Sequence, residues 1–329
     1  MRSTRLAPSP TGALHLGNAR TFLLNWLIAR QNGWKVVLRI EDIDGPRIKK
    51  GAAQGLIDDL RWLGIDWDEG PITQSERRPF YDAALQNLFA RGHAYPCVCS
   101  RKEVEAAASA PHAEDGSAVY PGTCRGRFQS IEAARASSGR APAIRFAVPG
   151  GRTVEFEDAF SGPQSFDVAR ALGDFVIAKA DGTPAYQLAV VVDDADMGVT
   201  NVVRGNDLLD STPRQILLYE ALGLADRIPN YCHFPLVVGT DARRLAKRHG
   251  DTRLAFYRDL GVSAARVLAL LARWCGVDDV GDRVTSGELI ARFNLQTLSR
   301  TPITFTAADD AWLRSDPTTP AQLKTVETT

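Results

Sequence analysis

The sequence predicts an α/β fold organised around a β-α-β unit, and three neighbouring segments support this prediction. Arg5 and Leu6 end a first strand, because two prolines and a Thr-Gly turn follow within six residues. From Ala19 onward, apolar side chains recur at steps of three and four residues, which is typical of a helix. The β-rich run 35–40 follows an Asn-Gly pair and completes the unit.

The segment His15 to Asn18 is expected at or near the N-terminus of the first helix. Unpaired backbone N–H groups and the positive end of the helix dipole favour a phosphate there. The alternative is an ordinary strand, turn and helix in which His15 is a packed surface residue. Spacing alone does not decide between the two.

Acidic residues follow the second strand, at 41–44, where a doubly wound sheet binds its ligands. The alternative is a helix N-cap followed by solvated acids. Helices are expected at about 54–63 and from 74–77 through Leu88.

Composition narrows the class of protein. The 329 residues have zero formal net charge and are 44% hydrophobic, as in soluble globular proteins, and zero charge argues against broad, nonspecific coating of nucleic acid. No apolar run of about 18 residues and no leader-like N-terminus occur, so we expect no membrane association and a cytoplasmic location. Five cysteines, an odd number, favour reduced thiols or metal ligation over disulfides.

Residues from about 95 to 165 differ in character from the rest. Cys97, Cys99 and Cys124 lie within 28 residues, which points to zinc, although Cys-x-Cys is tighter than the usual knuckle and a structural site has four ligands. Buried reduced thiols are the alternative. Between Arg125 and Arg152 there are six arginines and one acid, Glu132, so this segment either contacts RNA or is an ordinary solvated surface.

The second half of the sheet is expected to begin near Gly173. Residues 174–179 and 185–192 predict two strands across a turn, and 199–204 a further strand ending in polar residues. Helices are expected at about 212–222 and 264–274, whereas the Thr/Asp/Pro-rich tail from Thr301 has no clear structure.

A basic loop follows residues 235–239. Four basic side chains within 243–248, with His249 as a fifth when charged, fit a triphosphate. No internal repeat, Walker A loop or Gly-x-Gly-x-x-Gly occurs, which excludes the two common phosphate loops.

Residues 8–17, Pro-Ser-Pro-Thr-Gly-Ala-Leu-His-Leu-Gly, resemble the HIGH signature of class I aminoacyl-tRNA synthetases of the glutamyl and glutaminyl group. Residues 244–248 resemble the second signature, the KMSKS loop. The resemblance implies a Rossmann-like class I fold with an inserted zinc-bearing subdomain and a short helical C-terminal region. It divides the chain into a first catalytic half at 1–95, a zinc-binding, tRNA-facing insertion at 96–165, a second catalytic half at 166–240, and the KMSKS-like loop with a helical region at 241–329.

The resemblance also implies roles for individual residues. His15 and Lys247 would be catalytic. The residues that would bind ATP are His15, Gly17, Asn18 and Lys247, with Mg²⁺ accompanying the nucleotide. Those that would bind glutamate are Arg5, Ala7, Ser9, Glu41, Tyr186 and Arg204, since guanidinium forks match carboxylates. Asn18 stands in place of the second histidine of the HIGH signature, and Ala246 in place of the usual serine of the KMSKS loop.

The same resemblance completes a metal site. In the short glutamyl-synthetase paralogues a tyrosine joins three cysteines, which here gives Cys97, Cys99, Tyr120 and Cys124 around one structural Zn²⁺ per chain. His112 is the competing ligand.

The resemblance covers roughly residues 5–275, and only about 50 residues follow, too few for the helical anticodon-binding region of full glutamyl-tRNA synthetases. We therefore expect a monomeric ATP-dependent ligase that activates L-glutamate to glutamyl-adenylate without tRNA. Its acceptor, as for the truncated paralogues, would be the queuosine base in the anticodon of tRNA(Asp). The alternatives are a truncated glutamyl-tRNA synthetase that charges a tRNA 3′ end and a non-catalytic tRNA-binding paralogue.

Overall fold

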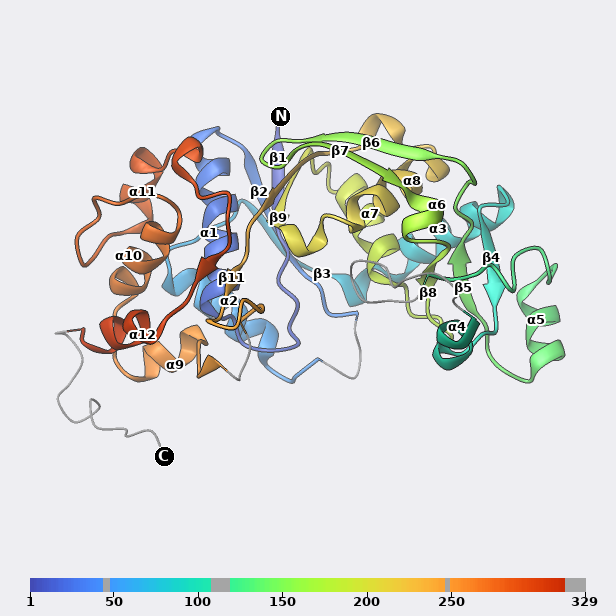
Figure 1. Ribbon diagram of the computed structural model, residues 1–329, viewed down its shortest axis with the longest axis horizontal. Coiled ribbons are helices and arrows are strands. Elements are labelled where there is room, and N and C mark those ends of the chain that lie inside the picture. The colour runs from blue at the N-terminus through green and yellow to red at the C-terminus, as the bar shows by residue number, and fades with distance from the viewer. Residues whose placement is uncertain (44–47, 108–118, 246–248, 317–329) are drawn as a thin grey trace. The chain divides into compact units, whose positions relative to one another are not determined.

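The computed structural model describes residues 1–43, 48–107, 119–245 and 249–316 (Figure 1). The chain divides into two compact units. The first comprises Met1–Thr73, Val203–Asn206 and His233–Thr329, and the second comprises Gln74–Val202 and Asp207–Cys232. The chain passes from one unit to the other within two of its strands, β9 (Asn201–Gly205) and β10 (Asn230–Phe234).

The first unit begins with the predicted β-α-β arrangement. Strands β1 (Ser3–Leu6), β2 (Lys35–Ile40) and β3 (Glu69–Thr73) form a parallel sheet in that order. Helix α1 (Leu16–Gln31) connects β1 to β2, and α2 (Ala52–Trp62) precedes β3. This confirms the β-α-β prediction from the sequence.

Helix α1 is central to the first unit, because it is buried on nearly all sides. Its Arg20 is fully buried and donates hydrogen bonds to the carbonyl oxygens of Pro235 at 2.7 Å and Trp274 at 3.0 Å. Helices α10 (Ala264–Trp274) and α11 (Ser286–Arg292) pack against α1 (Figure 1). The remaining elements of this unit are β11 (Val237–Val238), α9 (Leu254–Asp259), η6 (Leu295–Thr297), β12 (Ile303–Thr304) and α12 (Ala307–Arg314).

The expectation of an unstructured tail from Thr301 is wrong as far as Arg314. Strand β12 pairs with β11 in parallel, and α12 follows it. A capping box starts α12: the Thr306 hydroxyl accepts the Asp309 N–H at 3.3 Å, and the Asp309 carboxylate accepts the Thr306 N–H at 2.8 Å. This Thr-x-x-Asp signal is local and outweighs the Thr/Asp/Pro-rich composition on which the expectation rested.

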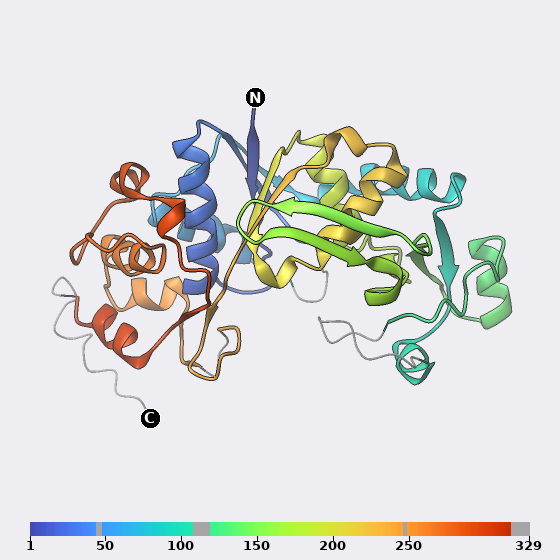
Figure 2. The same cartoon turned by 45° about the horizontal axis from the view of Figure 1, so that its top comes forward.

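The second unit contains an antiparallel sheet in the order β4-β5-β8, formed by Ala94–Cys97, Ala143–Phe146 and Phe175–Ala178. Strands β6 (Thr153–Asp158) and β7 (Gly162–Asp167) form a hairpin, and the two strands run side by side in Figure 2. The hairpin belongs to a sheet with the strand order β7-β6-β10-β9. The helical elements are η2 (Gln74–Arg77), α3 (Arg78–Ala90), α4 (Arg101–Ala107), α5 (Ile131–Ser138), α6 (Val168–Ala171), α7 (Tyr186–Asp196), η3 (Asn206–Leu208), which begins in the first unit, α8 (Ser211–Leu222) and η4 (Ala225–Arg227).

The predicted strand at 185–192 is wrong, because these residues belong to helix α7. Residues 188–192 are a continuous run of buried apolar side chains, in which periodicity does not separate a buried helix from a buried strand. A non-local contact fixes the helix: the buried Asp193 carboxylate accepts hydrogen bonds from Arg77 at 2.6 Å, Gln74 at 2.7 Å and Tyr81 at 2.9 Å. Among the described residues, no helix has the length and apolar character needed to span a bilayer.

Candidate active site and metal centre

His15 is the N-cap of α1, as the sequence predicts. Its backbone is extended, and its Nδ1 atom accepts the N–H of Asn18 at 3.3 Å. Because Nδ1 is the acceptor, the proton of the neutral ring is assigned to Nε2. Burial, assisted by the positive charge of Arg244, lowers the pKa of His15 to about 4. In the absence of ligand, His15 is therefore a neutral hydrogen-bond donor near pH 7.

Gly17 leaves room for the His15 ring. A Cβ atom built on Gly17 would lie 3.2 Å from both Cε1 and Nδ1 of His15 and 3.5 Å from Cβ of Val237. The sequence prediction assigned this glycine to ATP binding. The structure adds that any side chain here would press first against His15.

The HIGH-like segment pairs with the residues that follow the basic loop. The Leu16 N–H donates to the Thr252 carbonyl at 2.9 Å, and the Leu254 N–H donates to the Leu14 carbonyl at 2.8 Å. These two bonds hold His15 against the end of that loop. The predicted catalytic residue Lys247 lies outside the described residues, as do its neighbours Ala246 and Arg248.

The start of the basic loop is a tight turn. Gly239 donates its N–H to the Arg243 carbonyl at 2.8 Å, and Ala242 has a positive φ of 59°. The His249 ring packs on Gly239, where a Cβ atom would collide with it, and His249 Nε2 lies 2.8 Å from a carboxylate oxygen of Asp241. The sequence does not reveal this contact, which ties the two ends of the loop together.

Arg5 on β1 and Arg204 on β9 are 4% and 5% exposed, so both guanidinium groups are withdrawn from solvent. Arg5 Nη1 lies 3.5 Å from the Val203 carbonyl, which places Arg5 beside the strand that carries Arg204. Arg204 Nε donates to Nε2 of the fully buried His233 at 2.9 Å. Sequence analysis missed His233, because no local pattern connects it with a residue 29 positions away.

Glu41 follows β2 and lies beside the segment that contains Ala7 and Ser9. Its N–H donates to the Pro8 carbonyl at 3.0 Å, and its carboxylate pairs with the buried Arg39 at 3.1 Å. Tyr186, the remaining predicted glutamate ligand, begins α7 in the second unit.

The predicted metal ligands do come together. The sulfur atoms of Cys97, Cys99 and Cys124 lie within 4.8 Å of one another, and the Tyr120 hydroxyl lies 3.3 Å from Cys97 Sγ and 3.6 Å from Cys99 Sγ. All five cysteines of the chain are free thiols. The competing ligand His112 lies outside the described residues.

These distances fit a tetrahedral zinc site. Zn–S bonds of about 2.3 Å and Zn–O bonds of about 2.0 Å place ligand sulfurs roughly 3.8 Å apart and sulfur and oxygen roughly 3.5 Å apart. The Cys99 and Cys124 sulfurs are 3.5 Å apart, and the Tyr120 contacts span the expected sulfur–oxygen value. Burial raises the pKa of Cys99 to about 11, so binding of a metal ion would have to displace a thiol proton.

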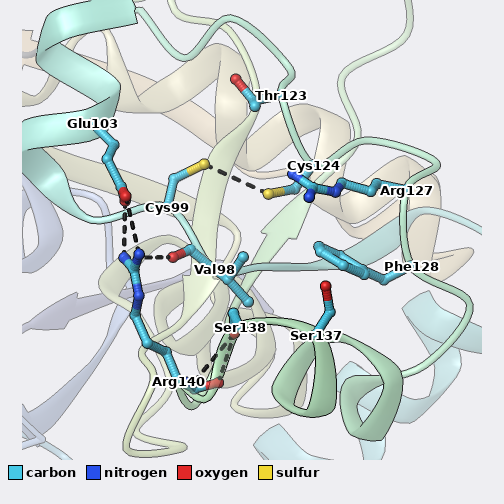
Figure 3. A pocket seen from close by; sticks show the side chains of 10 residues that line it. All are labelled: Val98, Cys99, Glu103, Thr123, Cys124, Arg127, Phe128, Ser137, Ser138 and Arg140. Atoms are coloured by element: carbon cyan, nitrogen blue, oxygen red, sulfur yellow. Dashed lines mark hydrogen bonds and ion pairs between the residues drawn. The ribbon is translucent and has the colours of Figure 1, made fainter.

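A pocket of about 480 Å³ lies beside this cluster. In Figure 3 the Cys99 and Cys124 sulfurs point toward one another at its wall, with Arg127 and Phe128 next to them. Arg140 and Glu103 also line the pocket and form an ion pair at 2.9 Å. The pocket gives an ion a path to the two thiols.

Several arginines of the predicted basic segment are engaged within the protein. Arg125 pairs with Asp174 at 3.4 Å, Arg140 with Glu103, and Arg152 with Glu220 at 2.6 Å. These pairs reduce the net positive charge of the segment. They favour the solvated-surface interpretation over an uninterrupted RNA-binding face.

A parallel β-α-β unit whose first helix begins at a histidine, with residues 252–254 paired against that helix start, agrees with the catalytic domain of a class I synthetase. The family described as tRNA synthetases class I (E and Q), catalytic domain, matches residues 2–309. The chain belongs to this family and is a ligase of the aminoacyl-tRNA synthetase type.

The chain is 52% identical over 309 residues to a glutamyl-Q tRNA(Asp) synthetase of Symbiobacterium thermophilum, covering 91% of this chain and 94% of that protein. It is 41% identical to a glutamate–tRNA ligase of Citrifermentans bemidjiense, covering 94% of this chain and 65% of that ligase. Among solved structures it resembles a glutamate tRNA ligase of Elizabethkingia meningosepticum crystallised with its amino acid, with a TM-score of 0.79 and 29% identity, over 95% of this chain and 68% of that one.

Proposed function

We propose that the protein uses ATP to activate L-glutamate, without tRNA, and transfers the glutamyl group to the queuosine base in the anticodon of tRNA(Asp). The observation that carries the first half is the pair of buried arginines, Arg5 and Arg204, in the unit that also holds His15. Two guanidinium groups suit a substrate with two carboxylates, and burial makes each match more discriminating. The second half rests on the greater identity to the glutamyl-Q relative than to the glutamate–tRNA ligase.

In the first step, an oxygen of the glutamate α-carboxylate attacks the α-phosphorus of ATP, and pyrophosphate leaves. Arg5 and Arg204 would hold the two carboxylates of glutamate. Glu41, which lies beside the segment that contains Ala7 and Ser9, would accept hydrogen bonds from the substrate ammonium group. Most of the catalysis in such a step comes from positioning and charge stabilisation. Tyr186 is proposed as a further glutamate-binding residue.

The neutral His15 would donate a hydrogen bond from Nε2–H to a phosphate oxygen. At the N-terminus of α1, the backbone N–H groups of Gly17 and Asn18 would donate further hydrogen bonds to the phosphates. Lys247 would supply positive charge to the triphosphate, and Mg²⁺ bound with ATP would neutralise further charge. In the second step, a hydroxyl of the queuosine base attacks the activated carbonyl carbon, and AMP leaves.

Cys97, Cys99, Cys124 and Tyr120 are proposed to hold one structural Zn²⁺. Such an ion cross-links the loop after β4 to the segment before α5. A monomeric state and a cytoplasmic location are also proposed.

Two assays test this function. ATP–pyrophosphate exchange that depends on glutamate and proceeds without tRNA tests the activation step, and Lys247→Ala should lower its rate by about 10²–10³-fold. Exchange that requires tRNA, or its complete absence, would contradict this step and support the alternatives.

Incorporation of radiolabelled glutamate into purified tRNAs tests the acceptor. We expect labelling of tRNA(Asp) that contains queuosine, and none of tRNA(Glu) or of tRNA(Asp) from cells that cannot make queuosine. Labelling of tRNA(Glu) would instead establish a glutamate–tRNA ligase.

A further inference from the structure

With an ion bound, the proposed metal centre would carry a charge that the protein must offset. Three thiolates around a divalent ion leave a net charge of about −1, even when the fourth ligand is a neutral hydroxyl. Cys97 and Cys124 are only 2% and 1% exposed, so little of this charge reaches water. Uncompensated charge in such a site is costly, and a nearby cation lowers the cost.

Arg145 on β5 supplies that cation. Its Nε atom donates to Cys97 Sγ at 3.3 Å, and its guanidinium carbon lies 3.8 Å from the centre of the Tyr120 ring. The second contact is a close cation–π interaction. Arg145 thus contacts two of the four proposed ligands: the edge of its guanidinium group faces Cys97, and the flat face of the group lies over the Tyr120 ring.

Strand pairing explains how Arg145 reaches the cluster. In the antiparallel pair of β4 and β5, Arg145 lies opposite Tyr95, and Cys97 is two residues further along β4. Residues two apart in a strand point to the same face, so Cys97 is the diagonal neighbour of Arg145 on that face. A long arginine side chain spans this diagonal.

The two residues just before β8 hold both partners of this contact. Arg145 Nη1 donates to the Asp174 carbonyl at 2.8 Å, while Gly173 pairs with Tyr120 in an isolated parallel bridge. A Cβ atom on Gly173 would lie 3.2 Å from the Tyr120 backbone, and the φ of Gly173 is +65°. The Asp174 carboxylate is fixed in turn by the Tyr95 hydroxyl at 2.6 Å. Arg145 and Tyr120 are therefore positioned from the same two-residue segment.

We propose that Arg145 is a positioning residue of the zinc centre, which orients the Cys97 thiolate toward the ion and offsets the negative charge of the loaded site. The proposal rests on the metal centre proposed above and does not depend on the glutamyl-transfer reaction. Arg140, which lines the neighbouring pocket, is bound to Glu103 and does not take this role.

The test compares zinc affinities by competition with a chromophoric chelator. Arg145→Met, which keeps an unbranched stem but has no donor or charge, should weaken zinc binding by about 10–100-fold, the usual loss for an outer-shell partner. Arg145→Lys should recover part of the loss. Arg152→Met is the matched control, because Arg152 belongs to the same unit and pairs with Glu220, and it should bind zinc as the unaltered protein does.

A merely structural role is excluded by spectroscopy. In cobalt-substituted protein, Arg145→Met should shift the thiolate-to-cobalt charge-transfer band, because Cys97 loses its hydrogen bond, whereas Arg152→Met should not. Circular dichroism establishes whether each variant is folded. If Arg145→Met is not folded, the zinc affinity and cobalt spectrum of Arg145→Lys are compared with those of Arg152→Met instead. Unchanged zinc affinity and an unchanged cobalt spectrum in Arg145→Met would overturn the proposal. An unaltered protein that binds no zinc would overturn it together with the metal centre, while pyrophosphate exchange reports separately on the proposed reaction.

Discussion

Gly17→Ala should separate the stability of the protein from its activity. Two effects of the new methyl group oppose each other in stability. Alanine is the better helix former by up to about 1 kcal/mol, less at the second position of a helix than in its interior. Against this, the Cβ would lie 3.2 Å from two atoms of the His15 ring, where ordinary carbon contacts are about 3.5–4.0 Å. A shift of a few tenths of an ångström of that ring relieves the contact, so the net change should stay within about 1 kcal/mol.

Activity should fall even where stability barely changes. His15 is the N-cap of α1, and its ring is oriented by the hydrogen bond between Nδ1 and the Asn18 N–H. A displaced ring loses this orientation and no longer aims its Nε2 proton at a phosphate. Misplacement by about 1 Å costs up to roughly 10²-fold, so for a shift of a few tenths of an ångström we expect a roughly 3–10-fold lower maximal rate of glutamate-dependent pyrophosphate exchange. The midpoint of thermal unfolding should change by only about 2–4 °C.

Gly55→Ala is the matched control. Gly55 lies inside α2, and a Cβ atom there would have no neighbour within 4 Å. This variant should gain up to about 1 kcal/mol and exchange pyrophosphate at the unaltered rate. Exchange by folded Gly17→Ala at the same rate as Gly55→Ala would refute the packing argument for Gly17.

Three further predictions concern other parts of the molecule. Purified protein should contain about one zinc ion per chain by mass spectrometry, and Cys124→Ser should lose it. If the purified protein is metal-free and unfolds at the same temperature with and without chelator, the three cysteines are buried reduced thiols and not metal ligands. The pKa of His15 is lowered from 6.5 to about 4, so the folded state binds fewer protons than the unfolded state, and the free energy of unfolding should fall by at most about 3 kcal/mol as pH drops from 6.5 to 4. The variant Arg244→Gln should raise the pKa of His15, measured by NMR titration. An unchanged pKa would remove Arg244 as a cause of the shift. His233→Leu removes the hydrogen-bond acceptor of Arg204 and should raise KM for glutamate about 5–100-fold with KM for ATP unchanged. His233→Gln keeps an acceptor and should raise KM for glutamate less. Equal increases in the two variants would contradict the hydrogen-bond role of His233.

The parts of the fold that follow from local signals could be predicted from the sequence. Within the β-α-β unit, prolines separate β1 from α1 and an Asn-Gly pair separates α1 from β2. Helix α10 shows such clear periodicity that its predicted range, 264–274, is the observed one. The N-cap position of His15 is also local, since the side chain bonds a backbone N–H three residues on. The errors at α7 and α12 arose where composition was given more weight than such signals.

The partners of the site residues could not be predicted, because strand register decides them. His233 meets Arg204 across 29 residues, and Arg145 meets Cys97 across 48. Neither pair has a spacing that any motif requires. A slip of β5 by one residue against β4 would turn Arg145 to the opposite face of the sheet and leave the thiols facing Ile144 or Phe146 instead. The sequence therefore shows which thiols can gather, whereas the charge that stabilises them depends on a pairing that only the folded sheet defines.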